Sequence, residues 1–269
     1  MKKKQKRSIQ NNRQDYVNSP PLNDCESNIR IFATQKNGNT LDEYEDAYSC
    51  EKPFFSVADG ATESSFSKEW AKLLVTGFSN NKGAIKKDLK DILNLVISNA
   101  QAEWCEMLKT KTILWHAEEK VKRGAHAAFI GLRLINDYTL FRKKMKWESI
   151  SVGDSCLFVI RNDALIESFP IKKSSDFNSS PFLMSSVGKN DDIEMEISSG
   201  DLKGGDCIYL LTDAIAQWFL GAHENNKLPW KMMNDIKNKE EFQLFIDGLR
   251  SAHAIKNDDV TVMNIVIPD

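Results

Sequence analysis

Four short apolar segments of this chain each meet an aspartate at one end. The first, residues 54–58, runs into Asp59, and its aromatic and β-branched side chains are typical of a buried strand. A carboxylate followed by Gly60 is also ordinary turn chemistry, so this segment alone decides little. The pattern recurs in three further apolar segments, two that stop at an aspartate and one that follows it: Asp154, Asp213 and Asp258.

These aspartates form one site if the strand ends converge. Four carboxylates in one place repel one another and raise their own pKa values, and burying them unpaired is costly for a folded chain. Hard divalent cations with oxygen ligands, such as Mg²⁺ or Mn²⁺, remove that repulsion. The sequence therefore predicts an acidic metal site around which the rest of the chain is arranged.

Composition excludes several other classes of protein. The chain has 269 residues, 41% hydrophobic and 28% charged, with no membrane-length apolar window and no apolar core of a signal peptide. A net charge of −2 gives no basic field for nucleic acid. Five scattered cysteines without a Cys-x-x-Cys pair indicate reduced thiols. We expect a cytoplasmic protein that binds neither nucleic acid nor membrane.

The order of predicted elements indicates an α+β fold. Residues 1–28 are polar and rich in lysine and arginine, which predicts a flexible basic tail. Strands are then followed by two helices, many strands, two more helices and a last strand, which favours layers over alternating βαβ units. The helical patterns span 66–78, 85–104, 214–221 and 239–252. Residues 170–192 read as a mobile loop or flap, and 193–197 alternate like a half-exposed strand.

Five short motifs occur in one order along the chain, each with a carboxylate. They are Glu45-Asp46-Ala47, Val57-Ala58-Asp59-Gly60, Gly153-Asp154-Ser155, Leu211-Thr212-Asp213 and Asp258-Asp259-Val260-Thr261-Val262. In this order they resemble the metal-dependent serine/threonine protein phosphatases of type 2C (the PPM family), as a divergent bacterial-type member. The resemblance covers residues 29–269, which we expect to form the phosphatase-like domain.

The resemblance implies a fold and a set of site residues. The fold is a four-layer α-β-β-α sandwich of two antiparallel sheets flanked by helix pairs. The implied activity is hydrolysis of phosphoserine and phosphothreonine in proteins by a hydroxide that bridges two Mn²⁺ or Mg²⁺ ions, with a third, weaker metal. The residues that it implies as metal ligands, directly or through water, are Glu45, Asp46, Asp59, Gly60, Asp154, Asp213 and Asp258.

Within that set the resemblance implies separate roles. Asp59 bridges the two ions, and Gly60 offers its carbonyl to one of them. Asp213 and Asp258 complete the ligands of the first metal ion, so that these two and Asp59 are the catalytic residues through metal-bound water. Glu45 and Asp46 act through water, and Asp154 holds the third metal with Asp213. The implied partner is a phosphorylated protein, paired with a cognate kinase, and a monomer is expected.

Three positions depart from the family pattern. Leu41 stands where many members carry a phosphate-binding arginine, Ala214 follows the third acid in place of glycine, and Ala61 replaces the histidine of animal members. Arg30 and Lys36 lie upstream, and the sequence places neither at the site. Two alternatives stay open: a regulatory type 2C-like domain of little or no activity that binds phosphoprotein or metal, and a hydrolase of small phosphoesters.

Other catalytic readings find little support. The four histidines show no metal-ligand spacing: His116 and His253 read as surface residues, His126 as a core residue and His223 as part of a loop. Ser155 lacks the Gly-x-Ser-x-Gly elbow of a serine hydrolase.

Overall fold

The computed structural model describes residues 28–269 except 112, 114–117, 140–141, 179–180 and 191–192. The predicted basic tail lies outside the described residues, apart from its last residue. That residue, Asn28, donates its side-chain amide to the carbonyl of Val266 at 2.8 Å. Asn28 therefore belongs to the edge of the folded domain.

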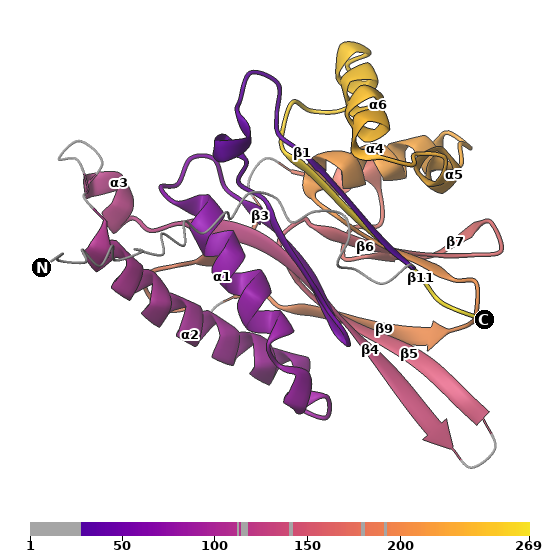
Figure 1. The fold of residues 1–269 in the computed structure, drawn as a ribbon, viewed down its shortest axis with the longest axis horizontal. Helices are drawn as coiled ribbons and strands as arrows, with labels where there is room; N and C mark the ends of the chain where they lie inside the picture. The colour runs from indigo at the N-terminus through magenta and orange to yellow at the C-terminus, as the bar shows by residue number, and fades with distance from the viewer. Residues whose placement is uncertain (1–27, 112, 114–117, 140–141, 179–180, 191–192) are drawn as a thin grey trace, which may run out of the picture.

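The described strands form two antiparallel sheets (Figure 1). One sheet has five strands in the order β1 (Ile29–Thr34), β11 (Val260–Val266), β10 (Cys207–Leu211), β6 (Cys156–Arg161) and β7 (Ala164–Phe169). The other has β2 (Ala47–Glu51), β3 (Phe54–Gly60), β4 (His126–Thr139), β5 (Arg142–Val152) and β9 (Glu196–Leu202) in that order, and β8 (Met184–Ser185) pairs with β4.

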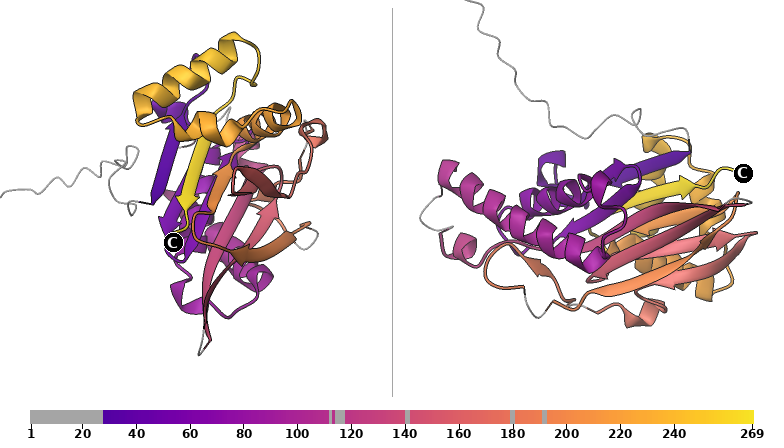
Figure 2. Two further views of the ribbon diagram at one scale, coloured as in Figure 1. Left: turned by 90° about the vertical axis from the view of Figure 1, so that its right-hand side faces the viewer. Right: turned by 90° about the horizontal axis from the view of Figure 1, so that it is seen from below.

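Helices cover the outer face of each sheet (Figures 1 and 2). Against the six-stranded sheet lie α1 (Ser67–Ser79) and α2 (Leu89–Thr110), and the five-stranded sheet carries α4 (Asp213–Glu224), α5 (Pro229–Asn234) and α6 (Lys239–Ser251). The described part of the chain also has a short α3 (Glu118–Lys122) and the 3-10 turns η1 (Leu41–Glu43), η2 (Lys82–Ala84) and η4 (Ser174–Asp176).

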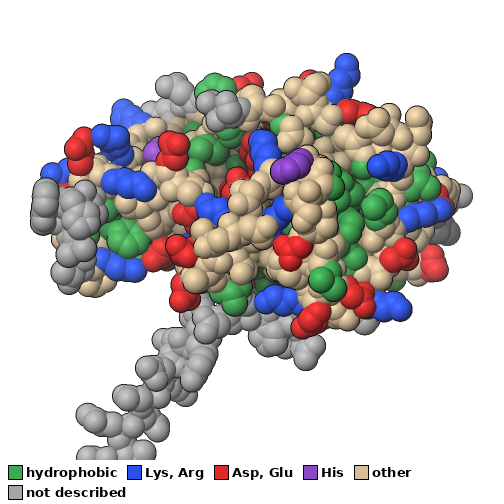
Figure 3. Space-filling view, turned by 90° about the horizontal axis from the view of Figure 1, so that it is seen from above, with side chains coloured by type: hydrophobic (Ala, Val, Ile, Leu, Met, Phe, Trp, Pro, Cys, Tyr) green, Lys and Arg blue, Asp and Glu red, His purple; other side chains and the backbone are tan. Residues whose placement is uncertain are grey.

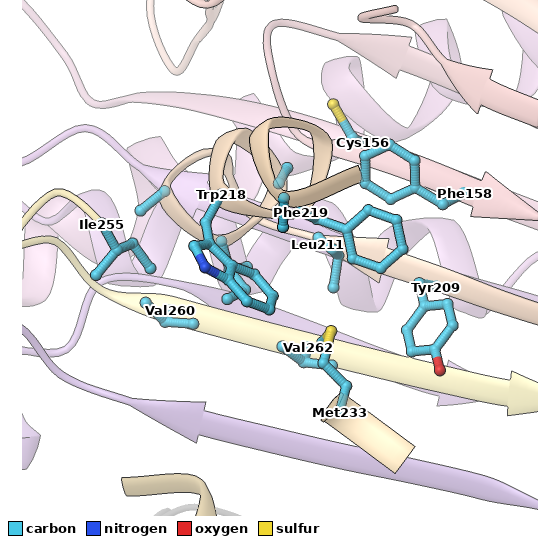
Figure 4. Close-up of a cluster of buried hydrophobic side chains, with 14 of the residues drawn as sticks. Cys156, Phe158, Tyr209, Leu211, Trp218, Phe219, Met233, Ile255, Val260 and Val262 are labelled. Atoms are coloured by element: carbon cyan, nitrogen blue, oxygen red, sulfur yellow. The ribbon is translucent and has the colours of Figure 1, made fainter. Parts of the chain in front are cut away.

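Three apolar clusters separate the layers and explain the strand sequences. In β3, Phe54 and Ala58 pack against α1 and α2, while Phe55 and Val57 pack between the sheets. A strand buried on both faces needs apolar side chains at nearly every position, which is why residues 54–58 form an almost unbroken apolar run. On the outer side of the five-stranded sheet, Trp218 and Phe219 of α4 pack over β10 and β11 (Figure 4). The predicted α-β-β-α architecture is confirmed.

One local prediction was wrong in part, and one helix was missed. Residues 193–195 are not a strand, and β9 begins only at Glu196, where it pairs with Ser151 of β5. Since β5 ends at Val152, the alternating residues before β9 have almost no strand to pair with, and Ile193 and Met195 pack on the helix-covered core instead. The helix α5 was not predicted, because six residues are too few for a clear helical period.

The segment 170–192 contains η4 and the two-residue strand β8 among its described residues. Within the described part of the chain, no helix has the length and apolar character needed to cross a bilayer.

Candidate metal centre

The acidic residues lie where strands of both sheets end. Asp59 is near the end of β3 and Asp154 follows β5. Asp213 is the first residue of α4, one residue after β10, and Asp258 precedes β11. The strand registers place these strand ends together at one end of each sheet. Leu211 pairs with Val262 in one sheet, and Phe129 pairs with Val152 in the other. Antiparallel pairing therefore gathers carboxylates that are far apart in the chain.

The pKa values of the aspartates are raised by burial and by one another. Burial raises the pKa of Asp59 well above its ordinary value, and the carboxylates of Asp46, Asp213, Asp258 and Asp154 raise it further. Burial, followed by the carboxylate of Asp213, raises the pKa of Asp154 to about 7. The same two causes, in the same order, raise the pKa of Asp258. These aspartates therefore lie near enough to one another to raise one another's pKa values.

Asp46 is held at this site with one oxygen unused. Asp46 is 4% exposed, and its Oδ2 accepts a hydrogen bond of 2.7 Å from the hydroxyl of Thr261. Tyr44 reaches the same hydroxyl with its phenol oxygen. Among the described residues, nothing hydrogen-bonds Oδ1 of Asp46, although that atom is buried. A buried acceptor without a donor is what a cation or its bound water would satisfy.

The two neighbouring acids before β11 have different surroundings. Both oxygens of Asp259 accept backbone hydrogen bonds, Oδ1 from the amide of Lys36 at 2.8 Å and Oδ2 from the amide of Glu45 at 2.7 Å. Asp258 accepts at Oδ1 from the amide of Asp259 at 3.0 Å. Asp259 therefore stabilises the segment before β2 through these hydrogen bonds, and Asp258 remains the candidate metal ligand.

Gly60 allows the close approach of three chain segments. A Cβ atom at this position would lie 2.6 Å from the carbonyl oxygen of Glu45 and 3.0 Å from the carbonyl carbon of Ser67. Ser67 also donates its hydroxyl to Oε1 of Glu45 at 2.5 Å. A side chain at position 60 would push Glu45 and the start of α1 away from the cluster.

Two lysines that the sequence analysis did not place lie at the cluster. Nζ of Lys36 is 3.8 Å from Oε2 of Glu45 and donates to the hydroxyl of Thr62 at 3.0 Å. Nζ of Lys256 lies 3.6 Å from Oδ2 of Asp213. Arg30 points elsewhere and donates to the carbonyls of Asn234 and Ile236. No short motif marks these lysines, because their places depend on contacts between distant segments.

Acidic and basic side chains lie close together around the middle of the face seen from above in Figure 3. In Figure 1 this is the side on which β3 runs toward α1 and β11 begins near α6. Of the acidic residues, Asp46 and Asp154 are buried, whereas Asp59, Asp213 and Asp258 are half-buried.

The donor set fits oxygen-ligated divalent cations. No group of three or more Asp, Glu, His or Cys side chains in the described part of the chain is arranged to enclose a metal ion by itself. Mg²⁺ needs no such cage, because it is usually bound through one or two carboxylates and keeps several waters. Mutual repulsion among the aspartates and the unused oxygen of Asp46 both favour a cation here.

Among the described residues, no histidine and no contact of Ser155 adds a ligand to this cluster. His253 is exposed as predicted, and His126 is half-buried, with burial lowering its pKa. His223 was expected in a loop, but α4 continues to Glu224 and includes it. His116 lies outside the described residues. Ser155 is fully buried, which agrees with the rejection of a serine hydrolase.

Comparison with solved structures identifies the fold. The serine/threonine phosphatase PstP/Ppp of Mycobacterium tuberculosis is 13% identical, with a TM-score of 0.57 over 90% of this chain and 99% of that one. The chain has the fold of the PPM-type serine/threonine phosphatases. The catalytic domain of PstP in complex with two manganese ions shares this fold at 14% identity and a TM-score of 0.56, over 90% and 99% of the two chains.

PppA, a key regulatory component of the T6SS in Pseudomonas aeruginosa, also has this fold. It is 15% identical to this chain, with a TM-score of 0.55 over 89% of this chain and 98% of its own. No family model and no curated protein matches the sequence. At identities this low, the structural similarity establishes a shared fold and nothing finer. The expected resemblance to the PPM phosphatases is confirmed at the level of the fold.

Proposed function

We propose that this protein is a metal-dependent phosphatase that hydrolyses phosphoserine or phosphothreonine in proteins. The observation that carries the proposal is the convergence of Asp46, Asp59, Asp154, Asp213 and Asp258 at the ends of strands from both sheets. A domain with only a structural role gains nothing from five mutually repelling carboxylates. The PPM fold supports the same reading.

In this proposal the carboxylates hold the cations, which we take to be two Mn²⁺ or Mg²⁺ ions with a third, weaker site. Bound divalent cations would lower the pKa of a water and neutralise phosphoryl oxygens. Asp59, the carbonyl of Gly60, Asp213 and Asp258 would hold the two cations directly. Glu45 and Asp46 would act through water, and Asp154 would serve the third site.

Lys36 is the candidate for holding the substrate phosphate. Its side chain is only 17% exposed, and its ammonium lies beside Glu45 and Thr62 at the edge of the cluster. Leu41, at the position where the family pattern has an arginine, is 52% exposed and cannot bind an anion. An ammonium at this place would meet the phosphate as a single point charge.

The proposed function also implies partners and a cellular compartment. The substrate is a phosphorylated protein, and a kinase must supply it. The thiols of Cys105, Cys156 and Cys207 are free, which is compatible with a reducing cytoplasm. We take the active protein to be a monomer.

The test is hydrolysis of a phosphothreonine peptide and of para-nitrophenyl phosphate with Mn²⁺, with Mg²⁺ and with EDTA. We expect metal-dependent activity that falls about 100-fold or more in Asp59→Asn. Glu103→Gln, an exposed carboxylate of α2, is the matched control and should leave the rate unchanged. Equal activity of Asp59→Asn and the native protein would refute the assignment. A folded protein that binds Mn²⁺ but hydrolyses neither compound would favour a regulatory domain.

A further inference from the structure

Arg250 is a buried arginine in the last turn of α6, the helix that lies near the start of β11 (Figure 1). It is 6% exposed, and its ion pair with Asp247, at 3.5 Å, reaches a side chain that is 42% exposed. Burial lowers the pKa of Arg250, and the carboxylates of Asp247, Asp259 and Asp258 oppose that effect. Burying a guanidinium is costly, so its hydrogen bonds indicate why an arginine stands here.

The guanidinium of Arg250 joins two segments that each carry a residue of the candidate site. Its Nη2 donates to the carbonyl of Asp258 at 2.7 Å and to the carbonyl of Gln35 at 3.0 Å. Its Nη1 donates to the side-chain oxygen of Asn37 at 3.2 Å. Asp258 is a candidate metal ligand. Gln35 and Asn37 flank Lys36, the candidate for holding the phosphate. One buried side chain therefore contacts both neighbours of Lys36 and the backbone of Asp258.

Further hydrogen bonds hold the same two segments together. The amide of Lys36 donates to Oδ1 of Asp259 at 2.8 Å. The amide of Asn37 donates to Oδ1 of Asn257 at 2.7 Å, and the side-chain amide of Asn257 donates back to the carbonyl of Asn37 at 3.2 Å. The chain around Lys36 is therefore held by the segment that leads from α6 to β11. A backbone fixed in this way lowers the entropy that the lysine loses when it binds an anion.

We propose that Arg250 is a positioning residue that sets the place of Lys36 relative to Asp258. The inference rests on the proposed function, which assigns the phosphate to Lys36 and a cation to Asp258. Arg250 acts only through these two residues. Groups that orient metal ligands from behind are often worth about 10- to 100-fold in metal affinity, and small errors in the place of a binding group weaken the binding of a reacting group.

The structure offers a matched control in Arg133 of β4. This arginine is 4% exposed and also donates to two main-chain carbonyls, of Ala84 at 3.4 Å and of Lys87 at 2.8 Å. It donates to Glu148 as well, and it pairs with the first residue of β3, whereas Asp59 lies near the other end of that strand. Arg133→Met therefore removes a comparable buried guanidinium away from the acidic cluster.

The first experiment measures two affinities by calorimetry: that of the protein for Mn²⁺, and that of the Mn²⁺-loaded protein for inorganic phosphate. We expect Arg250→Met to weaken both about tenfold. Arg133→Met should lower the free energy of unfolding and leave both affinities unchanged, because a residue with only a structural role does not alter what the folded protein binds. Circular dichroism at the temperature of the titrations checks that each variant is folded.

A double-mutant cycle tests whether Arg250 acts through Lys36. Arg250→Met should weaken phosphate binding in the native background and change it about twofold or less in a Lys36→Met background, where the positioned residue is absent. Equal weakening in both backgrounds would overturn the role. If Arg250→Met does not fold, Arg250→Lys replaces it in the cycle. That variant keeps the charge and loses the second arm of the fork, so its effect should be smaller and should also vanish without Lys36.

The outcomes separate this inference from the proposed catalytic function, because both affinities are measured without turnover. Weakened binding of Mn²⁺ and phosphate in Arg250→Met, in a protein that hydrolyses no phosphoester, would overturn the phosphatase function and keep the positioning role. Hydrolysis by the native protein with unchanged affinities in Arg250→Met would overturn the positioning role alone. A native protein that binds neither Mn²⁺ nor phosphate would overturn both.

Discussion

Replacing Asp154 by asparagine tests whether the folded, metal-free protein raises the pKa of this carboxylate through burial and its acidic neighbours. The pKa of Asp154 is raised from 3.8 to about 7, first by burial and then by Asp213. Between those two values the folded protein keeps a proton that the unfolded chain has released. The folded state therefore loses stability as the pH rises from about 4 to 7, whereas an asparagine side chain at this position would not titrate.

The magnitude follows from the shift. One pKa unit corresponds to about 1.4 kcal/mol, so ionising Asp154 costs the folded protein roughly 4 kcal/mol at pH 8 and roughly 1.5 kcal/mol at pH 5. The difference of about 2.5 kcal/mol is the contribution of this carboxylate to the pH dependence. Asp154→Asn should gain that amount of stability over the native protein between pH 5 and pH 8.

The assay is urea unfolding in EDTA at the two pH values. The free energies of unfolding are compared for the native protein, Asp154→Asn and the surface control Glu103→Gln. The control should follow the native protein at both pH values. If the difference between Asp154→Asn and the native protein were the same at pH 5 and pH 8, neither burial nor the neighbouring carboxylates would raise the pKa of Asp154.

Four further predictions address the residues around the cluster and its cations. Lys36→Met should weaken inhibition by inorganic phosphate about tenfold, measured as the inhibition constant, because the ammonium beside Glu45 is lost; an unchanged constant would exclude Lys36 from phosphate binding. Thr261→Val should lower the free energy of unfolding by about 1–3 kcal/mol, since Asp46 loses its donor; chemical denaturation would show this, and an unchanged midpoint would contradict it. Gly60→Ala should cost about 1–3 kcal/mol through its 2.6 Å clash with the Glu45 carbonyl and should reduce Mn²⁺ affinity by calorimetry; a native-like thermogram would refute the close approach. Mn²⁺ should raise Tm more at pH 8, where the carboxylates are ionised, than at pH 5, because cations that bind only the folded state stabilise it by about 2.7 kcal/mol at one hundred times their dissociation constant; equal Tm shifts would argue against carboxylate ligands.

Sequence patterns predicted the layers because burial dictates them. The residues from Phe54 to Ala58 are nearly all apolar because helices cover one face of β3 and the second sheet covers the other. The strand-end aspartates were recognisable for a related reason, since an acid at the end of a buried strand needs a partner. Both signals are local, and each can be read within a short window of the sequence.

Contacts between distant segments left no such signal. Asp259 binds the backbone amides of Lys36 and Glu45, which are far away in the chain, and Lys256 reaches Asp213 from the segment after α6. The strand β9 contains Ser198, Ser199 and Gly200, and it forms because β5 offers an edge and not because of its own propensity. Such features depend on the assembled tertiary structure, so a single sequence does not display them.

In the proposed function, the departures from the PPM pattern would change how a phosphate is held more than whether metals are held. Ala214 takes the place of a glycine, but it lies in the first turn of α4, where no left-handed backbone is needed. The exposed Leu41 offers no cation, and the half-buried Lys36 stands at the cluster instead. An ammonium lacks the planar fork with which arginine holds two oxygens at once. The variant Lys36→Arg therefore distinguishes the two ways of binding a phosphate. If the site accommodates a bidentate guanidinium, the variant should lower the KM for para-nitrophenyl phosphate. If the site accommodates only a point charge, the variant should raise that KM.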